Sequence, residues 1–488
     1  MKSSTRNLII AGAAALVLGG AVFAVNKLGG TGSSSSASDS SETIELISKT
    51  SSDVASMTVK NKKGSYTIIP MPTGTIGSSS AASTSLNFTV QELSGCPINI
   101  DRANAVVQNG ISLGALKNIG KVNNLSDFGL TDPQATVEVK YKDGSDFGYK
   151  IGSATATNSG TYYMCGLNSD NVYVVAVDDG ILEAATYFVK TDMLSITPDS
   201  SDSTSKANPQ NVFHKITLTG KNFPTPVVIQ EIDEMPTIVS PAKYEVDAQN
   251  VTDLLGVLGS LTADSAVVTK PDAAALKQYG FDNPTVKAVY SVNKENHTLI
   301  IGNKSSKGYY AMVDNINVIY EVSASDVSAL TDTDLFKLRS KLIFVPNINT
   351  VKKIEITSSG KTDVINVSRT ENTESSTEDN KVYNYKVTGT DGKELDYDKN
   401  YKNAYQTLIS LVIYDQTDKM PSGTPAITIK YSFFDKSTTN TLALYAIDNR
   451  HYTAVLDGTV YGLCTKNDVE NVLNAIADLE AGKTVSAS

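Results

Sequence analysis

Three histidines are the first residues to consider for chemistry, because imidazole is the usual general base and metal ligand near neutral pH. They are His214, His297 and His451. The three fall at different points of the repeated pattern described below, so a shared metal centre would need them to converge from separate domains. We therefore expect surface or strand-end histidines and no metal site.

Serine and lysine occur twice at the spacing of an acylating nucleophile and its base, at Ser203 to Lys206 and at Ser358 to Lys361. Ser169-Asp170-Asn171 spells a further fragment of the penicillin-recognising pattern. The first match lies in a Ser-rich linker and the second in a predicted hairpin turn. No Lys-Thr-Gly accompanies them, so we expect no acyl-transfer site.

Two Gly-Lys-Thr triplets resemble the end of a phosphate-binding loop. They begin at Gly360 and Gly482, but Glu355 and Ala477 stand where such a loop requires glycine. The spacing therefore excludes this kind of nucleotide site.

A calcium loop is the remaining metal candidate. The segment from Asp396 to Asn400 begins like an EF-hand, but Tyr401 holds the position of the required glycine and Thr407 that of the bidentate glutamate. Two further carboxylate pairs are better explained as solvated groups at helix starts and in linkers. They are Asp332 with Asp334 and Asp199 with Asp202. We expect no catalytic, cofactor-binding or metal-binding residues.

The amino-acid composition argues against some classes of binding partner. The formal net charge of -10 and the pI near 5.0 disfavour nucleic acid, whose phosphates attract clustered Lys and Arg. Cys96, Cys165 and Cys464 show no CxxC spacing, so neither a zinc site nor a disulfide framework is indicated. We expect buried or incidental thiols.

Tyrosine is the residue type that favours a binding surface, with 23 tyrosines and no tryptophan in the chain. Some recur at equivalent strand positions, which indicates packing: Tyr163, Tyr173, Tyr310, Tyr320 and Tyr461. Others cluster in the last third and are predicted to be exposed: Tyr383, Tyr385, Tyr397, Tyr401 and Tyr405. If the chain binds envelope polysaccharide, we expect this cluster to do so.

The elements that position these residues are repeated along the chain. Phe128-Gly129-Leu130-Thr131-Asp132-Pro133 and Tyr279-Gly280-Phe281-Asp282-Asn283-Pro284 begin the same series of signals. Each is followed by an Ile-Gly turn, a Tyr-Tyr pair and an Asn-Val strand, at Ile151-Gly152, Tyr162-Tyr163 and Asn171-Val172-Tyr173 and again at Ile301-Gly302, Tyr309-Tyr310 and Asn317-Val318. A third copy is more divergent, with Pro425, His451-Tyr452 and Val460-Tyr461 at the matching places.

Apolar alternation predicts a strand hairpin at the start of each copy. The paired strands are Val54 to Val59 with Tyr66 to Ile69, Phe213 to Leu218 with Val227 to Ile229, and Val351 to Ile356 with Val364 to Val367. Helical spacing follows at Val251 to Leu258 and at Tyr401 to Ile413. A terminal helix is predicted to close each copy, clearest at Asn467 to Leu479 with Asn467 or Asp468 as its cap.

These patterns predict an α+β fold with mainly antiparallel sheets. At 488 residues the chain is too long for one core. The expected organisation is an anchor over 1–28, a flexible spacer over 29–41, repeat 1 over 42–195, a linker over 196–210, repeat 2 over 211–342 and a divergent repeat 3 over 343–482.

The amino terminus is apolar and uncharged from Leu8 to Val25, which is long enough for a membrane-spanning helix. Lys2 and Arg6 precede it, so the bulk of the chain is expected outside the cytoplasm. A signal peptide cleaved after Val22-Phe23-Ala24 is the alternative. We expect a single-pass cell-membrane protein.

The repeated motifs resemble a bacterial family known as domain-of-unknown-function family 4340. The likeness covers roughly Asn87 to Val189 and Val227 to Leu335, and the last third weakly. Members often carry a tryptophan early in the unit, which this chain lacks. The resemblance implies a membrane-attached extracytoplasmic protein, with relatives found alongside ABC-type exporters related to gliding motility, and it implies no activity.

The function predicted from the sequence is that of a non-catalytic, membrane-anchored extracytoplasmic scaffold or accessory protein. Its expected partner is an envelope protein or an ABC-type transporter. The alternative is a binding module for envelope polysaccharide. Triplication without a catalytic set of residues favours the first, because repeated surfaces suit multivalent contact.

Overall fold

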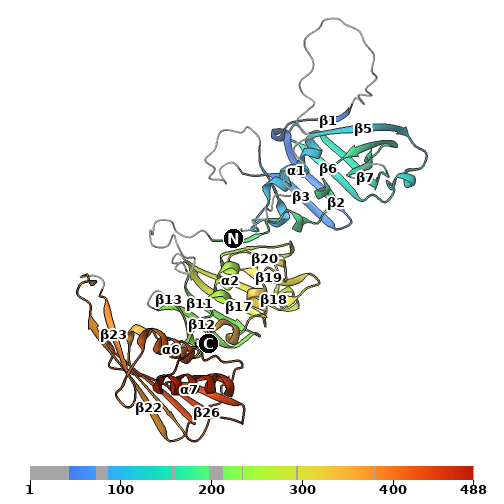
Figure 1. Cartoon of the computed structure of the whole chain (residues 1–488). Helices are drawn as coiled ribbons and strands as arrows, with labels where there is room; N and C mark the ends of the chain where they lie inside the picture. The colour runs from blue at the N-terminus through green and yellow to red at the C-terminus, as the bar shows by residue number, and fades with distance from the viewer. Residues whose placement is uncertain are drawn as a thin grey trace, which may run out of the picture.

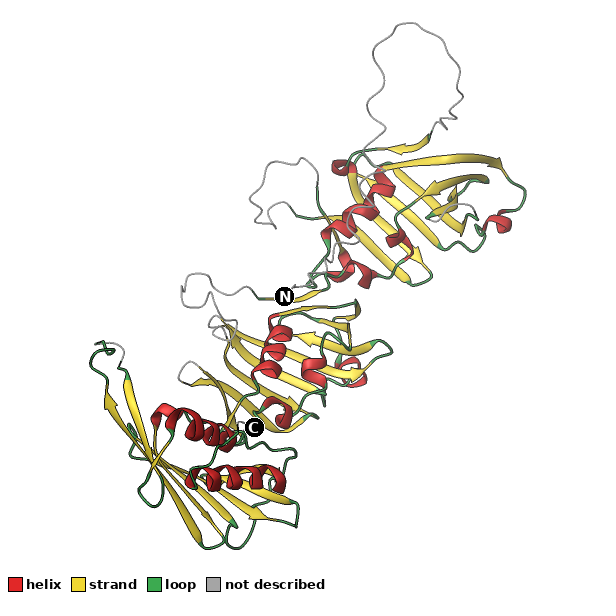
Figure 2. Ribbon diagram, viewed as in Figure 1, coloured by secondary structure: helices red, strands yellow, loops and turns green. Residues whose placement is uncertain are grey.

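The computed structural model describes residues 43–72, 86–156, 160–196, 213–232, 235–292, 295–377 and 381–486. In these residues three large antiparallel sheets follow one another along an elongated molecule, each with helices packed on one face (Figures 1 and 2). The parts of the chain that carry them are called the first, second and third modules. The fold is α+β and rich in strands, as the sequence predicts.

The first sheet has the order β1-β5-β9-β8-β7-β6-β2-β3-β4. Its strands are β1 (Ile44–Ser48), β2 (Val54–Asn61), β3 (Gly64–Pro70), β4 (Phe88–Val90), β5 (Ser112–Lys121), β6 (Ala135–Tyr141), β7 (Asp146–Ala154), β8 (Thr161–Gly166) and β9 (Asn171–Ala176). The predicted hairpin corresponds to β2 and β3, which pair through Val59 and Tyr66. Both residues are fully buried, as period-two alternation requires of a one-sided sheet.

The second sheet has the order β14-β13-β12-β11-β17-β18-β19-β20-β16. Its strands are β11 (Phe213–Gly220), β12 (Phe223–Ile232), β13 (Met235–Ser240), β14 (Tyr244–Glu245), β16 (Ser265–Thr269), β17 (Val286–Val292), β18 (Glu295–Lys304), β19 (Gly308–Val313) and β20 (Val318–Ser323). The third sheet repeats this order without a strand in the place of β16. Its strands are β21 (Val351–Ser358), β22 (Lys361–Glu371), β23 (Tyr383–Thr388), β24 (Glu394–Leu395), β25 (Ile427–Phe433), β26 (Thr439–Ala446), β27 (His451–Leu456) and β28 (Thr459–Thr465).

The helices are fewer than the strands. The α-helices are α1 (Ile100–Ile111), α2 (Ala248–Gly259), α3 (Ala273–Gln278), α4 (Ser328–Thr331), α5 (Leu335–Leu338), α6 (Lys402–Ile409) and α7 (Lys466–Glu480). Short 3-10 turns include η2 (Gln91–Leu93), η3 (Leu125–Phe128), η4 (Asp179–Leu182) and η5 (Ala185–Phe188), and a π turn, η9 (Tyr397–Tyr401), precedes α6. No helix in the described part of the chain is long and apolar enough to cross a membrane. The predicted anchor and spacer lie outside that part.

Three details of the predicted helices are wrong. A long terminal helix closes the third module alone, because η4, η5, α4 and α5 occupy the corresponding stretches of the other two in single turns. The cap of α7 is Thr465, whose side chain accepts a hydrogen bond from the amide of Asp468. Finally, α6 ends at Ile409 and not at Ile413, because the chain becomes extended and Val412 forms a β-bridge with Leu342.

A short strand pair joins consecutive modules. In the first module β1 pairs with β5, with Ser48 opposite Ser112 and a bulge between Glu45 and Ile47. The strands β10 (Asp192–Ser195) and β15 (Ser260–Thr262) repeat this pairing, with Ser195 opposite Ser260 and a bulge between Asp192 and Leu194. Since β10 follows the first sheet and β15 follows α2, this pair joins the first two modules.

The second and third modules are joined in the same place. Here an isolated β-bridge between Leu342 and Val412 takes the place of the strand pair. Beside it, the amide of Ile343 donates a hydrogen bond to the carbonyl of Leu411. Buried apolar residues of all three sheets form one continuous cluster. Apolar contacts therefore continue from one module to the next.

The repeated glycine motifs are explained by packing. A Cβ atom on Gly152 or Gly302 would collide with the backbone carbonyl of Phe128 or Tyr279, respectively. The aromatic ring of the first motif also meets the second tyrosine of the pair: the centres of Phe128 and Tyr163 are 5.0 Å apart, and those of Tyr279 and Tyr310 are 4.6 Å apart. The motifs that define the repeat thus converge on one structural contact.

Candidate functional site

Five tyrosines of the third module form a continuous series of ring contacts, called here the tyrosine row: Tyr383, Tyr385, Tyr397, Tyr401 and Tyr405. Successive ring centres are separated by 6.5, 5.3, 5.6 and 5.9 Å. The first two side chains come from β23, and the other three come from η9 and α6. The structure thus brings together the cluster that the sequence singles out.

The predicted exposure of the whole cluster is wrong. Tyr401 is 1% exposed and Tyr405 is 3% exposed, because the inner face of α6 packs against the sheet beside Leu408 and Tyr431. The other three, Tyr383, Tyr385 and Tyr397, are half-buried. Only this outer part of the tyrosine row can meet a ligand or a partner.

The buried hydroxyls of the row differ in their partners. Tyr405 Oη donates to the carbonyl of Pro346 at 2.6 Å. Tyr401 Oη has no hydrogen-bond partner among the described residues. Burial raises the pKa of Tyr401 well above its usual value, with the neighbouring Tyr405 and Tyr397 adding to the shift. Burial also raises the pKa of Tyr405. Both phenols therefore stay neutral.

The rings of the row cover one another. Tyr385 and Tyr397 are stacked with an interplanar angle of 7°, and the next face of Tyr397 meets Tyr401 at 25°. The Lys402 ammonium lies 5.1 Å from the centre of the Tyr397 ring. The row therefore presents ring edges and hydroxyl groups rather than open aromatic faces.

Arg369 closes the outer end of the row. Its guanidinium carbon lies 4.4 Å from the ring centres of both Tyr383 and Phe434, and its Nη2 atom pairs with Asp435 Oδ1 at 2.6 Å. The hydrogen bond to Asp435 raises the pKa of Arg369. The cation is thus held by two rings and one carboxylate.

A second aromatic cluster lies between the second and third modules. Arg339 is 3% exposed, and its guanidinium carbon lies 4.6 Å from the Tyr244 ring centre and 5.5 Å from that of Tyr461. Phe336 adds a third ring at 5.4 Å. Among the described residues the Nε atom of Arg339 has no hydrogen-bond partner. Burial lowers the pKa of Arg339.

Arg339 is not among the residues predicted from the sequence to form a site. The signal that could have found it is its place in the repeat: Val189 bridges Ile98 in the first module, and Arg339 bridges Val246 in the second. An arginine at a position that holds valine in the preceding copy marks a change in the joint.

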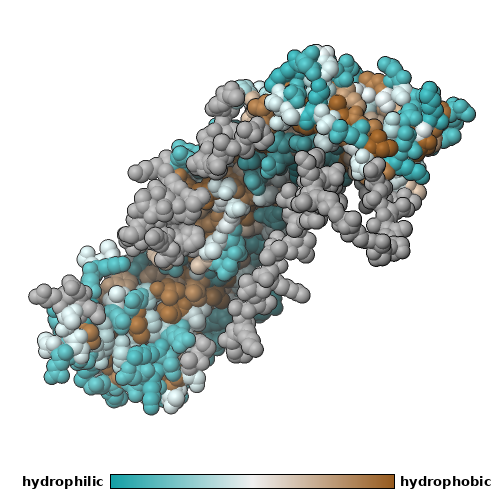
Figure 3. All heavy atoms as spheres, turned by 90° about the horizontal axis from the view of Figure 1, so that it is seen from above, coloured by the Kyte–Doolittle hydropathy of each residue, from teal (hydrophilic) through white to brown (hydrophobic). Residues whose placement is uncertain are grey.

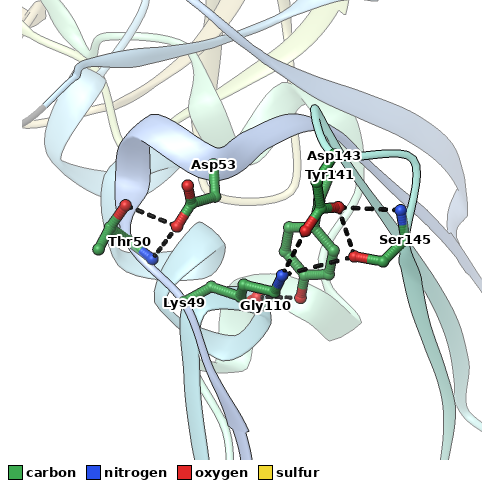
Figure 4. A network of polar contacts seen from close by, with 7 residues as sticks. All are labelled: Lys49, Thr50, Asp53, Gly110, Tyr141, Asp143 and Ser145. Atoms are coloured by element: carbon green, nitrogen blue, oxygen red, sulfur yellow. Dashed lines mark hydrogen bonds and ion pairs between the residues drawn. The ribbon is translucent and has the colours of Figure 1, made fainter.

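A polar network closes the start of the first sheet (Figure 4). Lys49 Nζ pairs with Asp143 Oδ2 at 2.8 Å and lies 4.9 Å from the ring centre of Tyr141. Tyr141 Oη donates to the carbonyl of Gly110 at 2.6 Å. Hydrogen bonds from Lys49 and Ser145 hold the pKa of Asp143 well below its usual range. The network ties β1 to the turn between β6 and β7.

The histidines lie apart, each in its own surroundings. His214 Nδ1 is 3.5 Å from Glu231, His297 stacks on Tyr290 with ring centres 5.5 Å apart, and His451 Nδ1 is 2.9 Å from Asp448. Within the described ranges no group of His, Cys, Asp or Glu could hold a metal ion.

The other motif residues have structural contacts. Ser358 and Lys361 face each other across the turn between β21 and β22. Asp396 Oδ1 accepts the amide of Lys399 at 2.7 Å as the cap of η9, and Asp334 caps α5 through the amide of Lys337. Asn171 donates its amide to Ser169 Oγ. Ser203, Lys206, Asp199 and Asp202 fall outside the described residues.

The tyrosines that recur in the repeat are partly interior. Tyr320 and Tyr461 are buried, as predicted for packing residues, while Tyr163, Tyr173 and Tyr310 are half-buried. The thiols of Cys165 and Cys464 are buried and that of Cys96 is partly exposed, and all three are free.

A broad polar cleft of about 850 Å³ lies between α2 and the segment that carries α4 and α5. Asp253, Asp326, Asp332 and Lys337 are its charged lining residues. Lys337 Nζ already donates to the carbonyl of Asp332 at 2.5 Å. No pattern in the sequence predicts this cleft. No residue pattern in it points to a particular reaction.

On the face shown in Figure 3, hydrophilic residues predominate among smaller apolar patches. Comparison with curated proteins gives no match, and comparison with solved structures gives none either. A match to a family model begins in β13 and ends beyond α6, so it spans the joint between the second and third modules. The matching model is that of the family described as Domain of unknown function (DUF4340), and it matches residues 237–423.

Proposed function

We propose that the protein is a non-catalytic scaffold or accessory protein of the bacterial cell envelope. In this proposal segment 1–28 anchors the chain in the cell membrane, and the three modules lie outside the cytoplasm. The partner is a protein of the envelope or an ABC-type transporter.

The repeated joint between modules carries this proposal. The pairing of β1 with β5 inside the first module is reproduced by β10 with β15 across the joint between the first two modules, with the bulge at the same position. Modules that share interior contacts hold a fixed spacing, whereas modules on loose linkers would not. A row of similar units at fixed spacing suits simultaneous contacts with a large partner.

Membrane topology is tested by thiol labelling of whole cells. Cys96 is the partly exposed thiol, and Cys165 and Cys464 are buried. A membrane-impermeant maleimide should label the protein in cells whose outer barrier has been opened but whose cytoplasmic membrane is intact. The Cys96→Ser variant should remain unlabelled. Labelling only after the cytoplasmic membrane is broken would contradict the proposed location.

The partner is tested by purification from detergent-solubilised membranes after chemical crosslinking. We expect an envelope or transporter protein to be recovered with the full chain and to be lost with a variant that lacks residues 343–482. Recovery of no envelope protein from either sample would count against the scaffold role.

Binding of envelope polysaccharide is the second candidate, and the tyrosine row is the observation that favours it. Because the rings cover one another, a glycan would contact hydroxyls and ring edges of Tyr383 and Tyr397. Replacing both by phenylalanine removes these hydroxyls and keeps the stack. Retention on isolated cell-wall glycan should then fall several-fold, while Tyr405→Phe, a buried control, should not change it. Equal retention of all variants would remove this candidate.

A further inference from the structure

An apolar pocket of about 600 Å³ lies in the first module, beside its joint with the second. Its lining comes from the end of β3, from β4, from η2 and from the segment that leads into α1: Ile69, Met71, Pro72, Thr89, Val90, Gln91, Leu93, Ser94, Gly95, Cys96, Ile98 and Ile100. None of these lining residues is charged. The volume falls within the range of roughly 300–1,000 Å³ that is typical of small-molecule sites.

The second module carries a large side chain at the position that Cys96 holds in the first. The bridges from Ile98 to Val189 and from Val246 to Arg339 are equivalent, and Cys96 and Tyr244 each stand two residues before the bridge. The Tyr244 ring packs against Tyr461, with ring centres 5.3 Å apart. At this place the second module thus carries a ring and the first module only a thiol.

One cation lies beside the pocket. Lys270 Nζ donates to the carbonyl of Glu92 at 3.0 Å, and its positive charge acts on the Cys96 thiol. Lys270 comes from the second module, where its amide binds the carbonyl of Asn317 at 2.8 Å. The same carbonyl lies 4.0 Å from Cys96 Sγ. The Glu92 carboxylate accepts a hydrogen bond from the backbone amide of Thr67 at 2.9 Å.

We propose that this pocket binds an aliphatic carboxylate, such as a fatty acid. The hydrocarbon chain of the ligand lies against the uncharged lining, and its carboxylate lies beside Lys270. The charged group of a ligand cannot enter the interior of the pocket, because burying an unpaired charge in an apolar site costs free energy. Lys270, whose ammonium group binds the carbonyl of Glu92, supplies the complementary charge beside the lining. The site continues the established joint between the first two modules and is independent of the scaffold role.

An apolar peptide is a weaker fit for this site. Peptides that add to a sheet edge rely on a row of free backbone groups. The edge strand β4 has three residues, and the amide of Phe88 already donates to Asn104 Oδ1 at 3.0 Å.

The thiol of Cys96 provides the assay. The full chain is purified in CHAPS, a detergent without a flexible alkyl chain, and its reaction with Ellman's reagent is followed. Burial raises the pKa of the Cys96 thiol, so the unliganded rate is already slow. Saturating dodecanoate should slow the reaction at least about threefold, and propionate should leave it unchanged. An unchanged rate with dodecanoate, or equal slowing by propionate, would overturn the proposal.

Variants distinguish the contribution of the ligand's hydrocarbon chain to binding from that of its carboxylate. Displacement of a fluorescent fatty acid should show that Lys270→Gln weakens dodecanoate binding roughly tenfold and leaves dodecanol binding unchanged. Lys277→Gln, on the same module, is the matched control. Cys96→Tyr should abolish binding of both ligands, and Ile69→Phe fills the pocket from the opposite wall should Cys96→Tyr fail to fold. Protection of the thiol by a leucine-rich peptide and not by dodecanoate would assign the pocket to a protein partner instead.

Discussion

The guanidinium of Arg339 lies over the ring of Tyr244, 4.6 Å from its centre, in the joint between the second and third modules. The pair is buried, and Tyr461 of the third module lies 5.5 Å from the same guanidinium. A cation–π contact of this kind is worth about 2 kcal/mol when it is shielded from water. Arg339 therefore links the two modules through the rings on either side of it.

Replacing Arg339 tests this link. We expect Arg339→Met to lower the free energy of unfolding by about 1–2 kcal/mol, because methionine keeps the packing volume and loses the cation. Denaturant unfolding followed by circular dichroism measures the change. The matched control is Val189→Met at the equivalent position of the first module. If Arg339→Met unfolds at the denaturant concentration of the wild type, the rings contribute nothing beyond packing.

The two buried hydroxyls of the tyrosine row should respond differently to removal. Tyr405→Phe loses the hydrogen bond to Pro346 and should cost about 0.5–1.5 kcal/mol. Tyr401→Phe removes a hydroxyl that has no partner in the described part of the chain, so it should leave the stability unchanged or increase it by about 1 kcal/mol. Thermal melting of both variants compares them directly, and a larger loss for Tyr401→Phe would contradict the observed contacts.

The Ile-Gly motif should not tolerate a side chain. In Gly302→Ala the new methyl group would meet the carbonyl of Tyr279, so we expect a loss of about 1–3 kcal/mol from overpacking. At Gly256 in α2 a methyl group would meet no atom within 4 Å, so Gly256→Ala should stabilise the helix by about 1 kcal/mol. Opposite shifts in melting temperature are the expected result. Equal shifts would show that the contact with Tyr279 is not the cause.

Acid should lower the folding stability of the first module by protonating Asp143. Its pKa is lowered in the folded protein by hydrogen bonds from Lys49 and Ser145, relative to the usual value of 3.8. The unfolded chain therefore takes up this proton first as the pH falls. The stabilisation is present above about pH 4 and is lost as the pH falls through the folded value.

The Asp143→Asn variant isolates this effect. Its stability should be lower than that of the wild type near neutral pH, and the difference should shrink below about pH 4. Denaturation midpoints across this range provide the measurement. A difference that stays constant with pH would show that folding does not lower the pKa of Asp143.

The sequence alone determined the strand hairpins and the repeated architecture. Alternation at Val54 to Val59 identifies β2 because the backbone pleat sends successive side chains to opposite faces. The spacing from Gly280 to Gly302 identifies the second copy because both glycines serve one local contact. The clustering of the five tyrosines could also be predicted, because three of them lie within a stretch of nine residues. Such features depend on neighbours close in sequence.

Only the tertiary structure decided which tyrosines are covered and how the modules meet. Tyr397 and Tyr401 have the same residue type and lie one helical turn apart, yet one is half-buried and the other buried, because the third sheet covers a single face of that segment. Likewise, nothing local distinguishes Arg339 from a surface arginine. Its burial follows from contacts with Tyr244 and Tyr461, and residues so far apart in sequence meet only when the modules pack.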